Sequence, residues 1–223
     1  SNKFINVLGL IRNQYTTQIN HNDNICELLD NIRRINNILL DLNKDLWLYI
    51  SKNYFILHKE KNQIGSSTMP HKINPIHFEN SEGNLHLANN LFSFLSNKFP
   101  LSRLQRDLSN STIFRNLGYP LSLSIISFKS FIIGFNNIDI NKDFIYNELN
   151  NHFEIITEGI ATRLKILGIY NSYESLLDIS RNSNNNNIHD NINKYIQSID
   201  IPDKEKKYLL TITPHNYTGI YKL

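Results

Sequence analysis

Residues 24–52 read NICELLDNIRRINNILLDLNKDLWLYISK. The apolar residues of this stretch recur at steps of three and four, which is the spacing of one face of an α-helix. They are Ile25, Leu28, Leu29, Ile32, Ile35, Leu39, Leu42, Leu46 and Ile50. The pattern predicts one helix of about 30 residues, with Asp23 as its N-cap. A helix of this length exceeds the globular mean and is typical of a helical bundle.

Two further long helices are predicted downstream, over residues 75–97 and 116–135. Pro75 suits the first turn of a helix, because the N–H that proline lacks is not needed there. Pro100 ends the second helix, and Gly134 lies near the end of the third. Residues 1–22 show little periodicity and are expected to be irregular.

After residue 136 the helical patterns become shorter. They predict helices near 141–149, 151–167, 173–181, 189–198 and 203–210. Gly168 fits a helix C-cap, and Pro202 with Asp203 marks the start of the last helix. No strand of convincing length is found. The sequence therefore predicts an all-α fold, with a long-helix bundle over 1–135, including a loop at 61–75, and a smaller helical domain over 136–223.

Composition narrows the classes of function. The chain has 223 residues, of which 40% are hydrophobic, and a net charge of +3. Its charges are dispersed rather than gathered into a basic stripe, so nucleic-acid binding is not favoured. No signal peptide or 18-residue apolar run is found, and we expect no membrane partner. The single cysteine, Cys26, excludes an internal disulfide, is expected to be buried, and fits a cytoplasmic location.

The only methionine is Met69, so the chain does not begin at an initiator methionine. We expect further residues of the polypeptide to precede Ser1.

Residues 65–75, GSSTMPHKINP, combine a glycine, paired hydroxyls, a lysine, an amide and two prolines. Such a segment is typical of a loop that contacts an anionic ligand. Lys72 offers a positive charge, and Asn74 offers both a donor and an acceptor. A serine acts as a base only where its alkoxide is stabilised, which nearby peptide dipoles and a lysine can do. Spacing alone does not choose between Ser66 and Ser67 as that base.

A second polar segment, RDLSNSTIFR, occupies residues 106–115. Two arginines, Arg106 and Arg115, flank the hydroxyls of Ser111 and Thr112. At the start of the third long helix this set would suit an anion such as phosphate. The alternative is a simple helix cap with solvated arginines.

Residues 65–75 resemble the signature loop of the fumarase/aspartase superfamily, and the resemblance continues through residues 76–84. Taken with the 106–115 segment, the chain resembles the bacterial type of adenylosuccinate lyase within that superfamily. The 106–115 segment separates adenylosuccinate lyases from other members of the superfamily, because it resembles the nucleotide-phosphate site of adenylosuccinate lyases. Residues 15–19 and 213–219 also match the family pattern, and the resemblance covers nearly the whole chain.

The resemblance implies a role for each matching residue. Ser66 would be the general base. The residues expected to contact the succinyl group are Ser67, Lys72, Ile73 and Asn74. Gln18 and Asn80 would bind substrate elsewhere. The residues expected to hold the nucleotide, chiefly its phosphate, are Arg106, Ser111, Thr112 and Arg115.

The implied chemistry is β-elimination of fumarate by a lyase. The substrates would be adenylosuccinate, giving AMP, and the succinyl-carboxamide ribotide of purine synthesis (SAICAR, giving AICAR). No metal or organic cofactor is expected. The family's general-acid histidine belongs to an earlier segment that is not found here, and neither His71 nor His77 matches it. The chain alone is therefore expected to carry part of an active site and to be inactive by itself.

The resemblance also implies a homotetramer in which each active site draws residues from three subunits. Two alternatives stay open. One is another fumarate-releasing lyase of the superfamily, and the other is a non-catalytic oligomerisation scaffold.

Overall fold

The computed structural model describes residues 2–58, 74–182 and 187–219. The chain divides into two compact units, Ser1–Ile140 and Asn141–Leu223. Both are helical apart from one small sheet in the first unit, which confirms the predicted all-α class. Each unit is described by itself below.

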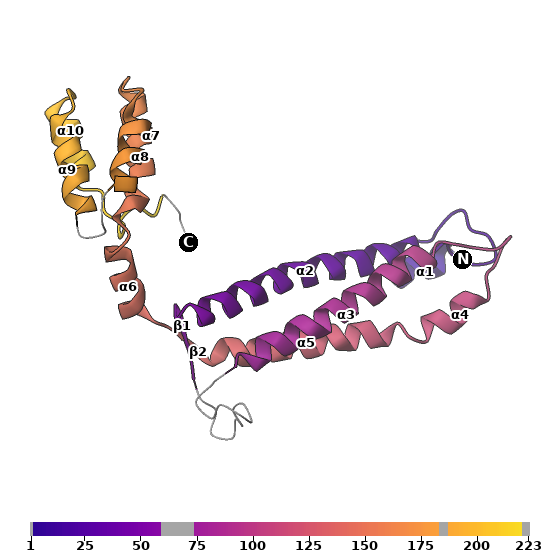
Figure 1. The fold of residues 1–223 in the computed structure, drawn as a ribbon. Coiled ribbons are helices and arrows are strands. Elements are labelled where there is room, and N and C mark those ends of the chain that lie inside the picture. Colours follow the sequence, from indigo (N-terminus) through magenta and orange to yellow (C-terminus); the bar gives the residue numbers. More distant parts are fainter. Residues whose placement is uncertain (1, 59–73, 183–186, 220–223) are drawn as a thin grey trace. The chain divides into compact units, whose positions relative to one another are not determined.

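Three long helices form the body of the first unit (Figure 1). They are α2 (Asp23–Ser51), α3 (Ile76–Lys98) and α5 (Gly118–Asn136), close to the three helices predicted from the sequence. Helix α3 packs against both α2 and α5. The predicted N-cap of the first long helix is wrong by one residue. Asp23 is already helical, and Asn22 caps the helix with a left-handed φ of 65°, a conformation that asparagine tolerates better than most residues.

Four short elements complete this unit. They are α1 (Asn2–Val7), β1 (Phe55–Leu57), α4 (Ser109–Phe114) and β2 (Ile138–Ile140). The irregular segment expected over residues 1–22 thus contains a short helix. The two strands pair antiparallel, with Ile56 opposite Asp139. The sequence did not predict them because three residues are too few to show alternation and the partner is far away in the chain.

An apolar cluster fills the bundle between α2, α3 and α5. Its buried members are Cys26, Leu29, Ala88, Phe92, Leu95, Phe99 and Leu123. The prediction that Cys26 is a buried free thiol is confirmed. Burial, and to a lesser degree the carboxylates of Asp23 and Asp30, raises the pKa of this thiol.

Buried amides also lie within the same bundle. Asn36 of α2 donates from Nδ2 to Asn89 Oδ1 and to Ser124 Oγ, both at 3.0 Å. One heptad later, Asn43 donates to Ser81 Oγ at 3.0 Å. Asn36 and Asn43 are fully buried, so sliding one helix along another would leave amide groups buried without partners. These bonds therefore favour one register of the three helices.

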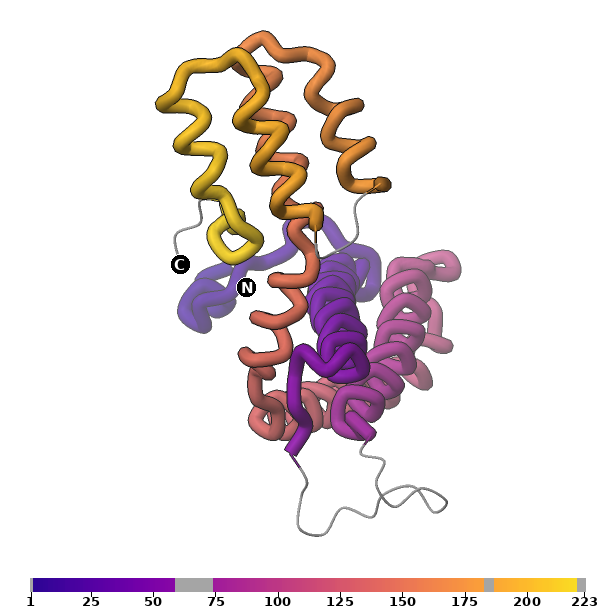
Figure 2. Tube along the Cα trace, turned by 60° about the vertical axis from the view of Figure 1, so that its left-hand side comes forward, coloured from indigo at the N-terminus to yellow at the C-terminus, as the bar shows by residue number. Residues whose placement is uncertain are grey.

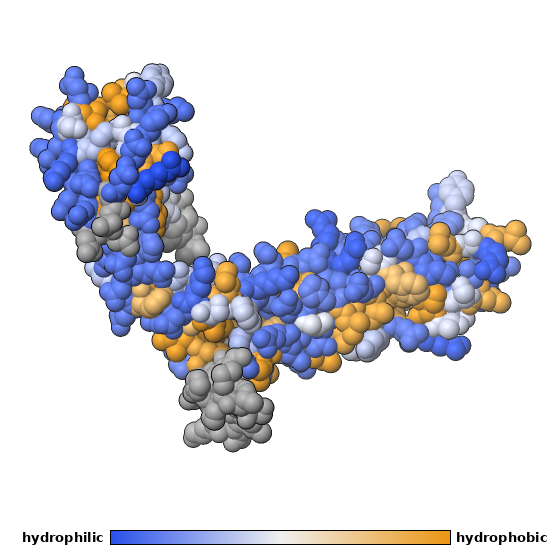
Figure 3. Space-filling model, viewed as in Figure 1, coloured by the Kyte–Doolittle hydropathy of each residue, from blue (hydrophilic) through white to orange (hydrophobic). Residues whose placement is uncertain are grey.

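The stretch Ser109–Asn136 is, among the described residues, long and apolar enough to cross a membrane by length and composition alone. The core helix of a bundle passes the same test, and α5 packs along α3. A second face of α5 remains exposed in the single chain. Its large apolar residues are Ile125, Ile126, Ile132, Ile133 and Phe135. Apolar surface is visible along this bundle in Figure 3.

Gly134 lets the end of α5 approach the beginning of α3. A Cβ atom at this position would lie 3.0 Å from His77 Cβ and 3.1 Å from Phe78 Cζ. Phe78 is buried, and its ring also packs edge-on against Phe131 at a centroid distance of 5.7 Å. Nearby, Ser130 Oγ donates to the backbone oxygen of His77 at 2.9 Å. The contact therefore fixes where α3 begins.

The second unit is built from shorter elements (Figure 2). They are α6 (Lys142–Asn150), the 3-10 turn η1 (Phe153–Ile156), α7 (Thr157–Ile166), α8 (Ser172–Asn182), α9 (Ile188–Ser198) and α10 (Asp203–Leu210). The helix predicted over 151–167 is thus divided into η1 and α7. Gly168 ends α7 as predicted, with φ of 85°, and Ile169 N–H donates to Leu164 O at 2.9 Å. This is the Schellman arrangement.

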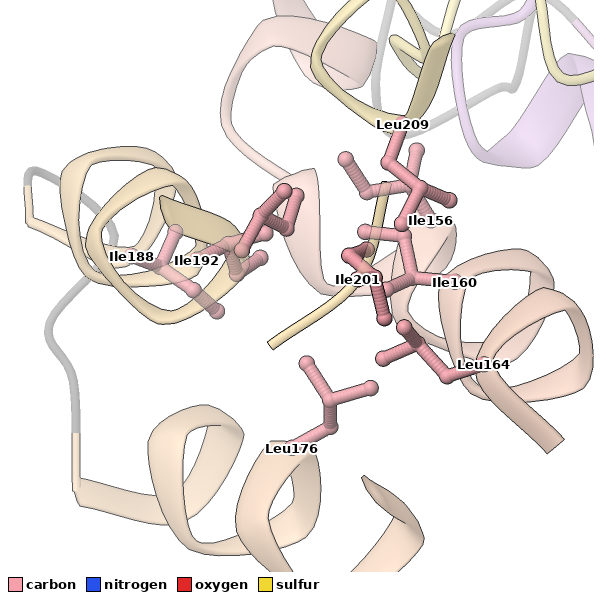
Figure 4. Close-up of a cluster of buried hydrophobic side chains, with 9 residues drawn as sticks. Ile156, Ile160, Leu164, Leu176, Ile188, Ile192, Ile201 and Leu209 are labelled. Carbon is pink, nitrogen blue, oxygen red and sulfur yellow. The ribbon is translucent and has the colours of Figure 1, made fainter. Parts of the chain in front are cut away.

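Isoleucine and leucine side chains from five of these elements and the α9–α10 connection converge on one core (Figure 4). Ile160, Leu164 and Ile192 are fully buried within it. On the rim, Arg163 donates to both carboxylate oxygens of Glu205 at 2.8 Å, which ties α7 to α10. The second unit thus has a hydrophobic core of its own.

Replacing Gly134 with alanine is expected to destabilise the first unit by about 1–3 kcal/mol, because the added methyl group overpacks His77 and Phe78. Gly83→Ala is the matched control. A Cβ at Gly83 meets nothing within 4 Å, so alanine should stabilise α3 by up to about 1 kcal/mol. Urea unfolding of both variants measures the difference. Equal effects of the two substitutions would contradict the close approach of α5 to α3.

Candidate functional site

The signature-loop residues Ser66, Ser67, Lys72 and Ile73 lie outside the described residues. Two other predicted residues of this region are described. Asn74 is half-buried just before α3, and Asn80 is exposed near the beginning of that helix. Asn84 Nδ2 donates to the backbone oxygen of Asn80 at 2.9 Å and to its side-chain Oδ1 at 3.4 Å.

The predicted phosphate-binding residues lie on and around α4. The exposed residues of this set are Arg106, Ser111, Thr112 and Arg115. The sequence placed Ser111 and Thr112 at the N-terminus of the third long helix, and this is wrong. They lie in the separate helix α4, and α5 begins only at Gly118, because the chain turns between them at residues 115–117. Neither Arg106 nor Arg115 forms an ion pair with any residue that the structure describes.

Ring stacking holds α4 against the end of α3. The rings of Phe99 and Phe114 stack at a centroid distance of 4.2 Å and an interplanar angle of 15°. Phe99 is buried, and its backbone oxygen accepts a hydrogen bond from Asn110 Nδ2 at 3.4 Å. Asn110 itself is only 4% exposed. The short helix is therefore fixed to the bundle on its inner side while its polar residues face outward.

An ion pair fixes the start of α4. Lys98 Nζ lies 3.1 Å from Asp107 Oδ2 and 3.1 Å from Asn110 Oδ1. Asp107 Oδ1 accepts the backbone N–H of Ser109 at 2.9 Å. The hydrogen bonds from Ser109, first from its N–H and then from its hydroxyl, together with the one from Lys98, lower the pKa of Asp107 to about 2.

Gln18 belongs to the same end of the bundle. Thr17 Oγ1 donates to the backbone oxygen of Gln105 at 3.1 Å, and Gln105 directly precedes Arg106. Asn22 Nδ2 donates to Phe99 O at 3.4 Å, at the beginning of α2. Three segments that are distant in the sequence thus meet here. They carry the predicted substrate glutamine and the predicted phosphate site.

The described residues do not bring this group together with Asn74 and Asn80. Helix α3 begins beside Asn74 and ends at Lys98, and α4 lies at its far end (Figure 1). A helix rises 1.5 Å per residue, so Asn80 and Lys98 are about 27 Å apart along the axis. The described residues of the predicted site therefore form two groups at opposite ends of one bundle.

Sequence reasoning did not single out Lys98 or Asn110. Lys98 lies in the last turn of α3 and Asp107 lies two residues before α4 begins, so their contact crosses a turn and no spacing pattern marks it. Within residues 2–58, 74–182 and 187–219, no group of three or more His, Cys, Asp and Glu side chains is arranged to hold a metal ion.

Comparison with known proteins identifies the family of this architecture. A family model described as "Adenylosuccinate lyase C-terminal" matches residues 102–218, just over half of the chain and including all of α4. The chain belongs to the adenylosuccinate lyase family. A second family model, described as "Lyase", matches residues 2–88.

Individual relatives agree with this assignment. An adenylosuccinate lyase from Dictyostelium discoideum is 47% identical over 99% of the chain and 48% of its own length. One from Buchnera aphidicola (subsp. Baizongia pistaciae) is 46% identical over 99% of the chain and 47% of its own length. One from Escherichia coli K12 is 41% identical over 98% of the chain and 48% of its own length. The chain spans about half the length of the adenylosuccinate lyases it matches.

The low pKa of Asp107 predicts an acid-dependent contribution to stability. An unfolded aspartate titrates near pH 3.9. Because the folded pKa is depressed to about 2, Asp107 stabilises the fold above pH ~4, and this stabilisation is lost as the pH falls toward 2. The stability difference between the wild type and Asp107→Asn should therefore be constant near neutrality and shrink between about pH 4 and 2. Urea unfolding across this range measures it. A difference that stays constant down to pH 2 would show that Asp107 carries no such charge-dependent bonds.

Proposed function

We propose that the complete protein containing these residues is an adenylosuccinate lyase. It would eliminate fumarate from adenylosuccinate to give AMP, and from SAICAR to give AICAR. One observation carries the proposal. Proteins named adenylosuccinate lyase are 41–47% identical to this chain over 98–99% of its length, so both ends of the bundle fall within the match.

The α4 end of the bundle would bind the nucleotide phosphate. Arg106 and Arg115 are exposed on either side of α4, and neither is paired with a described carboxylate. Guanidinium groups suit phosphate because they donate two parallel hydrogen bonds. Ser111 and Thr112 lie between the two arginines in the sequence and add hydroxyl groups. Gln18 would contact the substrate from the neighbouring segment.

The signature-loop end would carry the elimination. Ser66 would take the proton from the carbon beside a succinyl carboxylate, and the electron pair would pass into that carboxylate as an aci-carboxylate dianion. Lys72 and Asn74, with Ser67 and the backbone at Ile73, would stabilise this charge. Collapse of the dianion breaks the C–N bond, and the leaving nitrogen takes a proton from a general acid. By the family resemblance, that acid is a histidine from an earlier segment. Neither a metal nor an organic cofactor enters this scheme.

More than one chain would be needed for each site. About 27 Å of α3 separates Asn80 from Lys98. One bound substrate would be too short to contact both ends of the same chain's bundle. We propose a homotetramer in which the loop end of one subunit meets the α4 end of another. The exposed isoleucines of α5 support this assembly, because apolar helix faces of this kind are covered in oligomers. We place the enzyme in the cytoplasm, where its single free thiol, Cys26, would stay reduced.

Ser66→Ala in the complete protein is expected to lower kcat for adenylosuccinate by roughly 10²–10⁴ or more, because the proton acceptor is removed. Ser67→Ala is the matched control and should mainly raise KM. Loss of adenylosuccinate absorbance measures both. If Ser66→Ala retains full activity while Ser67→Ala loses it, the base is Ser67.

The same assay separates the alternatives. If the wild type leaves adenylosuccinate intact but releases fumarate from a succinyl substrate without phosphate, the protein is another lyase of the superfamily. If it cleaves no succinyl substrate, it is a scaffold and the proposed function is wrong.

A further inference from the structure

An ion pair lies directly behind the residues that would bind phosphate. Lys98 Nζ contacts Asp107 Oδ2 and Asn110 Oδ1, each at 3.1 Å. The two charged side chains are 23% and 12% exposed, respectively, so solvent screens this pair less than a surface pair. Asp107 is the next residue after Arg106, and its other carboxylate oxygen holds the N–H of Ser109 at 2.9 Å. The carboxylate therefore links the predicted phosphate-binding arginine to the first turn of α4.

The position of the Asp107 carboxylate is electrostatically unfavourable for the binding of an anion nearby. A carboxylate that stays ionised at neutral pH lies in the same ten-residue segment as two arginines and three hydroxyl residues. Its charge would repel a bound phosphate and would also compete for the guanidinium of Arg106. In the structure, Asp107 is paired with Lys98 instead, and Arg106 remains without an ion-pair partner among the described residues.

Lys98 is well placed to neutralise the charge of Asp107. It lies in the last turn of α3, where the helix dipole favours a cation. Its second contact, Asn110, is buried and also donates to Phe99 O at 3.4 Å. The lysine is thereby anchored to the bundle core and to α4 at the same time.

We propose that Lys98 and Asp107 form a charge-balanced pair that positions the predicted phosphate-binding segment, residues 106–115. Asp107 would set the start of α4 through Ser109, and Lys98 would cancel its charge so that Arg106 and Arg115 remain available to the ligand. Neither residue needs to touch the substrate. This inference rests on the proposed function, because it takes α4 as the phosphate-binding end.

Three variants of the complete protein test the pair. Lys98→Met leaves the Asp107 carboxylate uncompensated and should weaken AMP binding by about tenfold or more, while adenosine binding changes little. Lys98→Met combined with Asp107→Asn removes both charges and keeps an acceptor for Ser109 N–H. The double variant should return AMP affinity to within about threefold of the wild type. Lys98→Arg keeps the charge and should retain most of the preference for AMP.

Isothermal titration calorimetry with AMP and adenosine is the measurement, because it does not depend on turnover. Lys194→Met, which removes an exposed lysine from α9 in the second unit, is the control for the loss of one positive charge. Circular dichroism of each variant confirms that it is folded. The ratio of the two dissociation constants separates an electrostatic role from a structural one, since misfolding weakens both ligands alike.

The outcomes are distinct. Selective loss of AMP binding in Lys98→Met with recovery in the double variant supports the pair. Equal loss of AMP and adenosine, or no recovery in the double variant, overturns it and leaves the proposed function standing. A wild type that binds AMP no better than adenosine overturns the phosphate site itself, and this inference with it.

Discussion

The uninterrupted length of α3 is the constraint on which the candidate site depends. The helix runs from Ile76 to Lys98, with Asn74 just before its beginning and α4 beyond its end. A helix of 23 residues does not bend back on itself, so Asn80 and α4 lie at opposite ends of one chain's bundle. This separation supports the proposal that the residues acting on one substrate come from different copies of the chain. Under that proposal, assembly would be a requirement of the chemistry.

The packing around α3 keeps both of its ends in defined positions. Gly134 lets the beginning of α3 pack closely against α5. The stacked rings of Phe99 and Phe114 fix α4 at the other end of α3. Between these points, Asn36 and Asn43 hold the register through hydrogen bonds to α3 and α5. A shift of α3 in register would displace Asn80 and α4 together, because Asn80 lies on α3 and α4 is held against its end.

Much of this fold could be predicted from the sequence, because the long helices carry sustained three- and four-residue periods. The strands β1 and β2 were missed, since three-residue strands whose partners lie far apart leave no local pattern. The break between α4 and α5 was also missed, because residues 111–117 are compatible with a continuous helix. For the site, residue types indicated Arg106, Ser111 and Arg115. The role of Lys98 depends on a contact across a turn that no spacing rule describes.

A site shared between subunits is tested most directly by mixing two inactive variants of the complete protein. One carries Lys72→Ala, two residues before Asn74, and the other carries Arg115→Ala, at the end of α4. After dissociation and reassembly, equal amounts of the two should form hybrid tetramers in which about one quarter of the sites contain both native residues. Adenylosuccinate cleavage should return to about that fraction of the wild-type rate. Activity no higher than that of either variant alone would place both residues in one chain's site and contradict the shared site.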